Sequence, residues 1–280
     1  MDTVMPVNPA ELKAQVKTHW EREVCGARYG DDRTDRRHYF AEIEQRRYGL
    51  DYMLKDFARF DESAGKRVLE VGLGVGTDFV QWIRAGAVAT GRDLTEAAVM
   101  VTKEQVALVG GTADVAVGDA EALDAPDESF DIYYSWGVLH HTPNTERAFA
   151  EAARVLKPGG SFRIMLYHYH SVSAALVWLA QGPLHGRMVG LRGAYAAAME
   201  SPGTQLFSRT EARQLAERYF RAESVKIETF LGAGDLLNHR LSARYSSPMW
   251  RVMQAIYPSW LVKHVLGHRF GTVLTLEATK

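Results

Sequence analysis

The feature that most constrains this chain is a regular alternation of short apolar runs and longer amphipathic runs between residues 66 and 167. Short apolar runs bounded by turn residues predict buried strands, and runs with apolar residues three and four apart predict helices. The expected strands cover 66–71, 87–90, 113–117, 130–136 and 161–167, and the expected helices cover 78–85, 95–109 and 144–156. Because strands that alternate with helices are joined by right-handed crossovers, this pattern predicts five parallel strands with helices on both faces.

Two further strands are expected nearer the C-terminus, at 223–230 and 270–278. The turn before residue 161 is set by Pro158, which cannot continue a helix, and by the two glycines that follow it. The fold class predicted from all seven strands is α/β, a Rossmann-like doubly wound sheet that occupies the whole chain, 1–280, as a single domain.

Three segments lie outside the predicted core of residues 66–167. Residues 1–60 carry aromatic residues scattered among charges and predict an N-terminal cap of amphipathic helices. Segments 168–207 and 231–269 are rich in aromatic residues and histidine, and insertions of that length usually form lids or binding elements. We therefore expect two helical insertions on the substrate side of the sheet.

Composition narrows the class of partner and the compartment. The 33 Lys and Arg residues nearly cancel the 34 Asp and Glu residues, which favours a small-molecule partner over nucleic acid. Cys25 is the only cysteine, so a disulfide within the chain and a cysteine metal cluster are excluded, and a reducing compartment is expected. Residues 1–20 lack a secretory signal pattern, and the longest apolar run, 174–180, is far shorter than the roughly 20 residues of a membrane span. The expected location is the cytoplasm.

A glycine-rich segment, Glu70 to Asp78, follows the first predicted strand. Glycine suits a turn from strand to helix in which the backbone comes close to a ligand. Gly72, Gly74 and Gly76 form G-x-G-x-G, whereas the dinucleotide fingerprint needs glycine at the position of Thr77. The spacing therefore disfavours an NAD site, although an NAD-dependent oxidoreductase stays an alternative.

Asp93 lies just past the second predicted strand, at the carboxyl end where a carboxylate can accept hydrogen bonds from both hydroxyls of a ribose. Any cofactor that contains adenosine can use such a residue. The alternative is that Asp93 and Asp119 are solvated turn residues or helix caps. Glu70, in turn, has the alternative role of a buried carboxylate that fixes neighbouring backbone amides.

Five segments in this order resemble the class I S-adenosylmethionine (SAM) dependent methyltransferases, and most closely the group that includes the ubiquinone and menaquinone biosynthesis enzymes. They are Glu70–Asp78, Gly91–Leu94, Gly118–Glu121, Phe130–His141 and Leu156–Gly160. The resemblance implies the class I methyltransferase fold, SAM as the cofactor and a methyl transfer reaction.

The same resemblance assigns parts of the cofactor to parts of the chain. The glycine loop holds the methionine portion, Asp93 the ribose and Asp119 the adenine amino group, with Ser135 and Trp136 near the transferred methyl. The expected cofactor-binding residues are Glu70, Gly72, Gly74, Gly76, Thr77, Asp78, Asp93, Leu94, Asp119, Ala120, Glu121, Ser135 and Trp136. A protein that binds SAM without using it is the non-enzymatic alternative.

Histidines follow the fourth and fifth predicted strands and face the predicted cleft. An acceptor that is a phenol, an alcohol or a carbon acid must lose a proton, and histidine suits that task near neutral pH. The candidate bases are His141, His140 and His168, with His141 preferred. The alternatives are that His140 and His141 only shape a turn, and that His168 and His170 share a metal ion, although methyl transfer itself needs no metal.

Aromatic residues in the two insertions suit a pocket for an apolar or aromatic small-molecule acceptor. They are Trp178, Tyr195, Phe207, Trp250, Tyr257 and Trp260. Ordinary packing of extra helices is the alternative for most of them. A further alternative is peripheral contact with a membrane surface through the apolar faces near 172–180 and 250–266, which would give access to a lipid acceptor.

Overall fold

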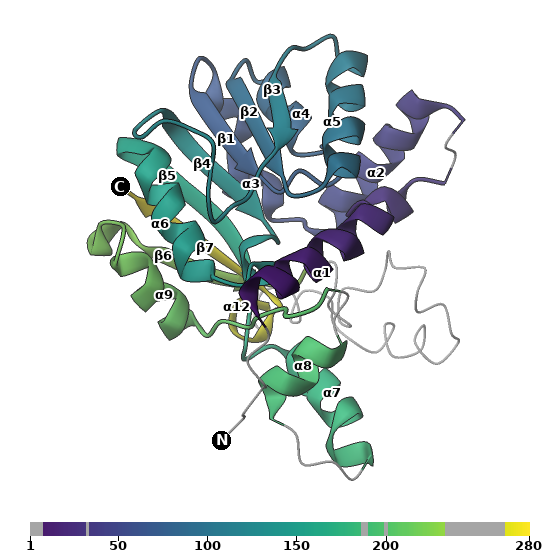
Figure 1. The fold of residues 1–280 in the computed structure, drawn as a ribbon, viewed down its shortest axis with the longest axis vertical. Coiled ribbons are helices and arrows are strands. Elements are labelled where there is room, and N and C mark those ends of the chain that lie inside the picture. The colour runs from purple at the N-terminus through teal and green to yellow at the C-terminus, as the bar shows by residue number, and fades with distance from the viewer. Residues whose placement is uncertain (1–7, 32–33, 186–189, 199–200, 233–266) are drawn as a thin grey trace.

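The computed structural model describes residues 8–31, 34–185, 190–198, 201–232 and 267–280. Its centre is a seven-stranded sheet in the order β3-β2-β1-β4-β5-β7-β6 (Figure 1). The strands are β1 Arg67–Val71, β2 Val88–Asp93, β3 Asp114–Val117, β4 Phe130–Trp136, β5 Leu156–Tyr167, β6 Lys226–Phe230 and β7 Val273–Thr279. Strands β1 to β5 are parallel, and β7 runs antiparallel between β5 and β6. The predicted class I methyltransferase fold is confirmed.

The α-helices precede, separate and follow these strands. They are α1 Pro9–Arg22, α2 Arg36–Leu50, α3 Leu54–Ala58, α4 Phe79–Arg84, α5 Glu96–Leu108, α6 Thr145–Val155, α7 Val172–Gln181, α8 Leu191–Ala198, α9 Arg209–Glu217 and α12 Gly267–Phe270. Side chains cap several of the N-termini: Asp35 caps α2, Thr95 caps α5 and Asn144 caps α6. Each cap satisfies backbone amides that have no partner within the helix.

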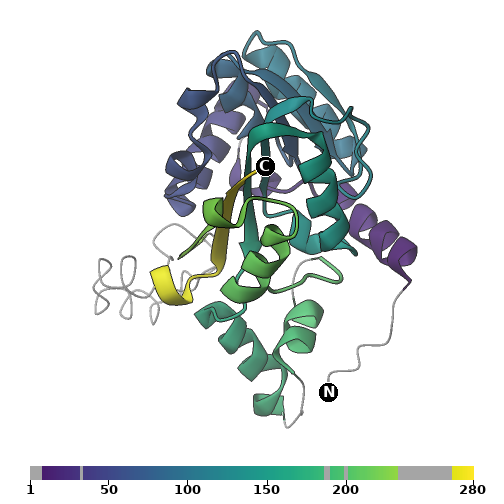
Figure 2. The same ribbon diagram turned by 90° about the vertical axis from the view of Figure 1, so that its left-hand side faces the viewer.

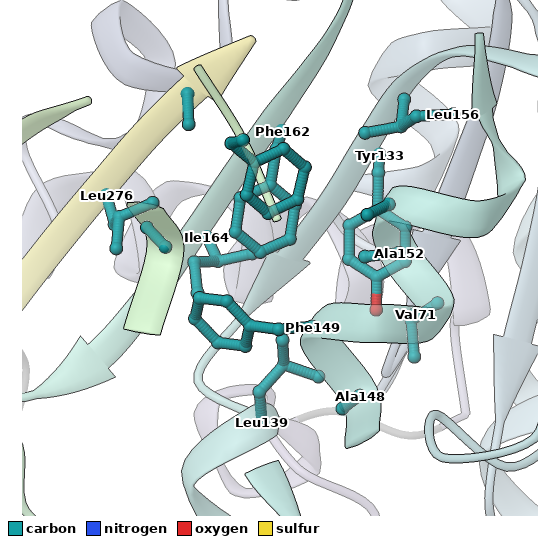
Figure 3. Close-up of a cluster of buried hydrophobic side chains, with 14 of the residues drawn as sticks. Val71, Tyr133, Leu139, Ala148, Phe149, Ala152, Leu156, Phe162, Ile164 and Leu276 are labelled. Carbon is teal, nitrogen blue, oxygen red and sulfur yellow. The ribbon is translucent and has the colours of Figure 1, made fainter. Parts of the chain in front are cut away.

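Two apolar clusters hold helices against the two faces of the sheet. On one face α6 and α9 pack on alternate residues of β1, β4 and β5. Figure 3 shows Phe149 of α6 beside Phe162 and Ile164 of β5, and the Phe149 and Phe162 rings lie 5.1 Å apart. On the other face α3, α4 and α5 pack around Trp82, Ile132 and the ring of Tyr134. The doubly wound arrangement therefore follows from strands that are apolar on both faces.

The boundary between α6 and β5 differs from the expectation. A helix to residue 156 and a strand from residue 161 were expected, but α6 ends at Val155 and β5 starts at Leu156. Leu156 pairs with Phe130 and Ser161 pairs with Ile132, so residues 157–160 form an irregularity inside the strand. Pro158 is tolerated there because it stands where the regular pairing is interrupted.

Three helices of the segments added to the core lie at the carboxyl ends of the strands. Helix α1 crosses the carboxyl ends of the strands, and α7 and α8 pack together and project beyond them (Figures 1 and 2). Of the aromatic residues expected to roof a pocket, Trp250, Tyr257 and Trp260 lie outside the described residues, as does the apolar face at 250–266. Within the described ranges, no helix has the length and apolar character needed to cross a bilayer.

Candidate active site

A pocket of about 1130 Å³, counted to its open mouth, lies at the carboxyl ends of β1 to β4 beneath α1. The predicted site residues that line it are Glu70, Gly72, Gly74, Thr77, Asp78, Asp93, Leu94, Asp119, Ala120, Trp136 and His141. Gly76, Glu121, Ser135, His140 and His168 do not belong to its lining. In open α/β sheets ligands bind at this end, so the pocket has the position expected for a cofactor.

The glycine loop after β1 is shaped by close contacts within the protein. Gly72 has φ +84°, and a Cβ there would lie 2.0 Å from a methyl group of Val138. Gly74 has φ +53°, and a Cβ there would lie 2.8 Å from the backbone oxygen of Cys25. Both positions need glycine because of their left-handed backbone and because other parts of the chain occupy the space. The close approach expected to involve a ligand involves the chain's own atoms at these two positions.

Asp93 joins the end of β2 to this loop. One carboxylate oxygen accepts from the amides of Leu73 at 2.8 Å and Gly74 at 3.3 Å. The other accepts from the amide of Thr95 at 2.9 Å and from its hydroxyl at 2.8 Å. Burial raises the pKa of Asp93, and these donors act against that rise. Since a carboxylate accepts about four hydrogen bonds, a ribose would have to displace the weaker donors.

Glu70 is a buried carboxylate at the end of β1, with 2% of its surface exposed. One oxygen accepts a 2.8 Å hydrogen bond from the indole nitrogen of Trp82. Burial raises the pKa of Glu70 well above its ordinary value. The hydrogen bond to Glu70 thus comes from a side chain of α4, whereas the alternative role expected donors among the neighbouring backbone amides.

Asp78 is the centre of a buried polar cluster between α2 and the sheet. Its two oxygens accept from Nε and Nη2 of Arg47, with the first bond at 2.8 Å. The hydroxyls of Tyr134 and Tyr48 donate to the same carboxylate at 2.9 Å and 3.1 Å. Planar two-point pairing of this kind is among the stronger hydrogen-bond arrangements in proteins. The N-terminal cap is therefore attached to the glycine loop through one carboxylate.

Asp119 and Glu121, which follow β3, both contact the N-terminal helix. The ammonium group of Lys13 lies 2.7 Å from an oxygen of each carboxylate. The other oxygen of Glu121 accepts from the amide of Asn144 at 2.8 Å. Asp119, the residue expected at the adenine, therefore lines the pocket while one of its oxygens is paired with Lys13. Glu121 connects the loop after β3 with α1 and with the N-cap of α6.

Three further predicted residues are Ser135 and Trp136, which end β4, and Thr77, which lies in the loop between β1 and α4. Ser135 is fully buried, and its hydroxyl donates to the backbone oxygen of Val71 at 2.8 Å. Trp136 lines the pocket and packs on Phe57. The buried hydroxyl of Thr77 has no hydrogen-bond partner within the part of the chain that the structure describes.

His141 lines the pocket, and its hydrogen bonds define the position of its proton. Nδ1 lies 3.0 Å from the hydroxyl oxygen of Thr204, and that hydroxyl donates to the backbone oxygen of Ser201 at 2.7 Å. Because the hydroxyl proton is committed to Ser201, Nδ1 is the donor to Thr204 and carries the imidazole proton. Nε2 then holds a lone pair. Burial lowers the pKa of His141 to about 3, so the ring is neutral near pH 7.

His140 and His168 are also buried. The ring of His140 packs against that of Tyr167 with the centroids 4.0 Å apart and the planes tilted by 36°. Its nitrogens have no well-aligned hydrogen-bond partner among the described residues. Nδ1 of His168 donates to the backbone oxygen of Gly271 at 3.0 Å. Burial lowers the pKa of His140 well below its ordinary value and that of His168 to about 4.

These buried histidines predict a loss of stability in acid. In the unfolded chain His141 and His168 take up protons as the pH falls below about 6.5. In the folded protein they do so only near pH 3 and pH 4, respectively. Stability is therefore complete above pH 6.5 and falls as pH decreases, by at most about 1.4 kcal/mol per pH unit for each residue. Urea unfolding of wild type and His168→Asn between pH 7.5 and 4.5 measures this term. The wild type should lose more stability than the variant, whereas His38→Asn, at an exposed site, should match the wild type. Equal losses in all three proteins contradict the prediction.

The N-terminal helices supply pocket residues that the sequence analysis did not identify. Lys13, Val16 and Trp20 of α1 all line the pocket, and their spacing places them on one helix face. Arg47 of α2 also lines it and falls on the face that carries the buried Phe40, Ile43 and Leu50. The position of Arg47 on an otherwise apolar face of a predicted helix could have identified it as a candidate site residue.

Comparison with known proteins relates part of the chain to methyltransferases. A methyltransferase domain profile matches residues 69–164. The phthiotriol/phenolphthiotriol dimycocerosates methyltransferase of Mycobacterium tuberculosis is 34% identical over 161 residues, which is 56% of this chain and 57% of that protein. The ubiquinone/menaquinone biosynthesis C-methyltransferase UbiE of Methylobacterium nodulans is 36% identical over 110 residues, 38% of this chain and 44% of that protein. The aligned region thus spans about half the length of these relatives.

Solved structures share the fold. A SAM-dependent methyltransferase of Thermotoga maritima, described as a possible histamine N-methyltransferase, superposes with a TM-score of 0.56. The superposition covers 95% of this chain and 99% of that one at 17% sequence identity. At this identity the similarity shows a shared fold only. The domain match and the sequence relatives show that residues 69–164 form a methyltransferase domain. The superposition shows that the chain has the fold of the class I SAM-dependent methyltransferases.

Proposed function

We propose that the protein transfers the methyl group of SAM to a small, uncharged acceptor, as a single domain with an N-terminal helical cap. One observation carries the proposal: Asp119, Asp93 and the Gly72–Gly74 turn follow the neighbouring strands β3, β2 and β1 and line the same pocket. That order matches the adenine, ribose and methionine portions of one extended cofactor.

Bound SAM supplies an activated methyl group on a cationic sulfonium, so the protein's part is to hold, align and dry the two reactants. Among the described residues, Asp93 and Asp119 are placed to bind the nucleoside, and the amides of the glycine loop to bind the rest of the cofactor. Trp20 and Val16 of α1 cover the pocket and exclude water from it.

The acceptor is proposed to bind at the end of the pocket beside β4. Its described lining there consists of Trp136, Gly137, Val138, His141, Thr142 and Pro143, together with Trp20, which packs 5.7 Å from the ring of His141. The charged lining residues Lys13, Arg47, Glu70, Asp78, Asp93 and Asp119 belong to α1, α2 and the ends of β1 to β3. A protonated amine would need an anionic partner, so this end suits a hydroxyl or a carbon acid on an apolar body.

His141 is the proposed base. Its Nε2 lone pair is available because Nδ1 is committed to Thr204. The low pKa makes it a weak base, but a hydroxyl becomes strongly acidic as its oxygen bonds to the methyl carbon, so a weak base suffices late in the transfer. Positioned bases contribute about 10²- to 10⁴-fold to such steps.

His141→Gln should therefore lower kcat by about 10²- to 10⁴-fold and leave the affinity for S-adenosylhomocysteine within about threefold. Steady-state assays and calorimetry measure the two quantities. His38→Gln, an exposed site on α2, serves as the matched control. A kcat within threefold of wild type would remove His141 from the mechanism.

The proposed function itself is tested by two measurements on the full chain. Calorimetry with S-adenosylhomocysteine and, separately, with NAD should show binding of the first alone. Incubation with methyl-labelled SAM and a panel of phenols, quinols, alcohols and lipid diols should then label one class. If S-adenosylhomocysteine does not bind, the proposal is wrong. If it binds but no compound of the panel and no compound in a cell extract becomes labelled, the protein only binds SAM.

A further inference from the structure

Arg47 reaches the cofactor pocket from the last turn of α2, a helix outside the matched methyltransferase domain. Two of its three guanidinium nitrogens, Nε and Nη2, donate to the two oxygens of Asp78. The third, Nη1, has no hydrogen-bond partner among the described residues, and 22% of the side chain is exposed through the pocket. One edge of the guanidinium is therefore bonded to Asp78, and Nη1 remains able to donate to another group.

The guanidinium is held in place before any ligand arrives. Asp78 fixes one edge of its plane, and Tyr48 and Tyr134 fix Asp78 by donating to the same carboxylate at 3.1 Å and 2.9 Å. A side chain fixed in this way loses little conformational freedom on binding, which favours recognition by its remaining donors.

The position along the pocket identifies what these donors meet. Arg47 is attached next to the glycine loop, after β1, whereas Lys13 is paired with Asp119 after β3. Strand β2 lies between β1 and β3, so the two cations are anchored to segments that follow different, non-adjacent strands. Among the described lining residues these are the only Lys or Arg side chains. Of these two side chains, Arg47 is the one that lies at the end proposed for the methionyl group, where it can bind an anion.

We infer that Nη1 of Arg47 binds the carboxylate of the cofactor's methionyl group. The inference rests on the proposed function and adds the residue that distinguishes the amino-acid end of SAM from a plain thioether nucleoside. Guanidinium and carboxylate match in charge and in planar geometry. The Arg47–Asp78 pair is neutral as a whole, and the methionyl group is a zwitterion, so its binding adds no net charge while one donor edge of Arg47 meets its carboxylate.

The test compares two ligands that differ at this end alone: S-adenosylhomocysteine, which has the carboxylate, and 5′-methylthioadenosine, which lacks it. Calorimetry is run on the wild type, on Arg47→Lys, and on Arg47→Met combined with Asp78→Asn so that no buried charge is left unpaired. Asp78→Asn alone shows what that second change contributes. Arg46→Met is the matched control, since Arg46 is the adjacent residue of α2 and pairs with the exposed Asp31.

The expected result is a loss of affinity for S-adenosylhomocysteine of about tenfold in Arg47→Lys and about 100-fold in the double variant. Affinity for 5′-methylthioadenosine should stay within about twofold throughout, and Arg46→Met should match the wild type for both ligands. Equal losses for the two ligands, or none, overturn the assignment of Arg47 while the proposed function stands. Failure of the wild type to bind either ligand overturns both.

Discussion

Asp93→Ala is expected to weaken binding of S-adenosylhomocysteine by about 100-fold or more. The substitution removes the carboxylate proposed to accept from the ribose and also the acceptor that fixes the amides of Leu73 and Gly74. Each hydrogen bond to a charged group contributes about 1.5–3 kcal/mol, so the loss of two accounts for the effect. Calorimetry measures the affinity directly.

A matched control for this variant is Asp114→Ala on the neighbouring strand β3. Asp114 pairs with Arg92 at 2.8 Å, and 61% of its side chain is exposed. Its removal should leave cofactor affinity unchanged. An Asp93→Ala protein that keeps wild-type affinity would show that the ribose is bound elsewhere, and that Asp93 serves only the loop.

Asp78→Ala is expected to lower the free energy of unfolding by about 3–5 kcal/mol, because it leaves the guanidinium of Arg47 and two tyrosine hydroxyls without their acceptor. A loss of that size lowers Tm by roughly 10 °C in a domain of this length. Replacing Arg47 by methionine and Asp78 by asparagine together should recover much of the loss, since no buried charge is then unpaired. Calorimetric or optical melting measures all three proteins.

Asp127→Ala provides the comparison for an exposed ion pair. Asp127 contacts Arg154 at 2.7 Å with 72% of its side chain exposed, and pairs of that kind contribute about 0–1 kcal/mol. Its Tm should lie close to that of the wild type. Similar Tm values for Asp78→Ala and Asp127→Ala would show that the Asp78 cluster does not stabilise the fold as its burial indicates.

The core of the fold was predictable because its signals are local. Strand β4 was expected at residues 130–136 and is observed there, and the glycine turn and Asp93 fall at strand ends as expected. Apolar runs and glycine spacing report the conformation of a few neighbouring residues, which a sequence displays directly. The start of β5 was expected at residue 161 because Pro158 cannot continue a helix and the glycines after it predict a turn, whereas the strand includes these residues in an irregularity.

The walls of the pocket were less predictable because they depend on contacts between distant segments. Arg47 meets Asp78 across 31 positions of sequence, and Lys13 meets Asp119 across 106. No local periodicity encodes such pairs. The partners of Asp93 were also unforeseen, since a sequence indicates that a carboxylate ends a strand without showing which donors already occupy it.

The N-terminal cap has a consequence for how proteins with this architecture diversify. Helix α1 contributes Lys13 to the proposed nucleoside end of the pocket and Trp20 to the end beside β4, two positions on the same two turns of helix. A substitution that shifts this helix to admit a bulkier acceptor also moves the ammonium group away from Asp119. With the proposed reactants, selectivity for the acceptor and retention of the cofactor would both depend on this one helix, so we expect changes at this surface to occur in pairs.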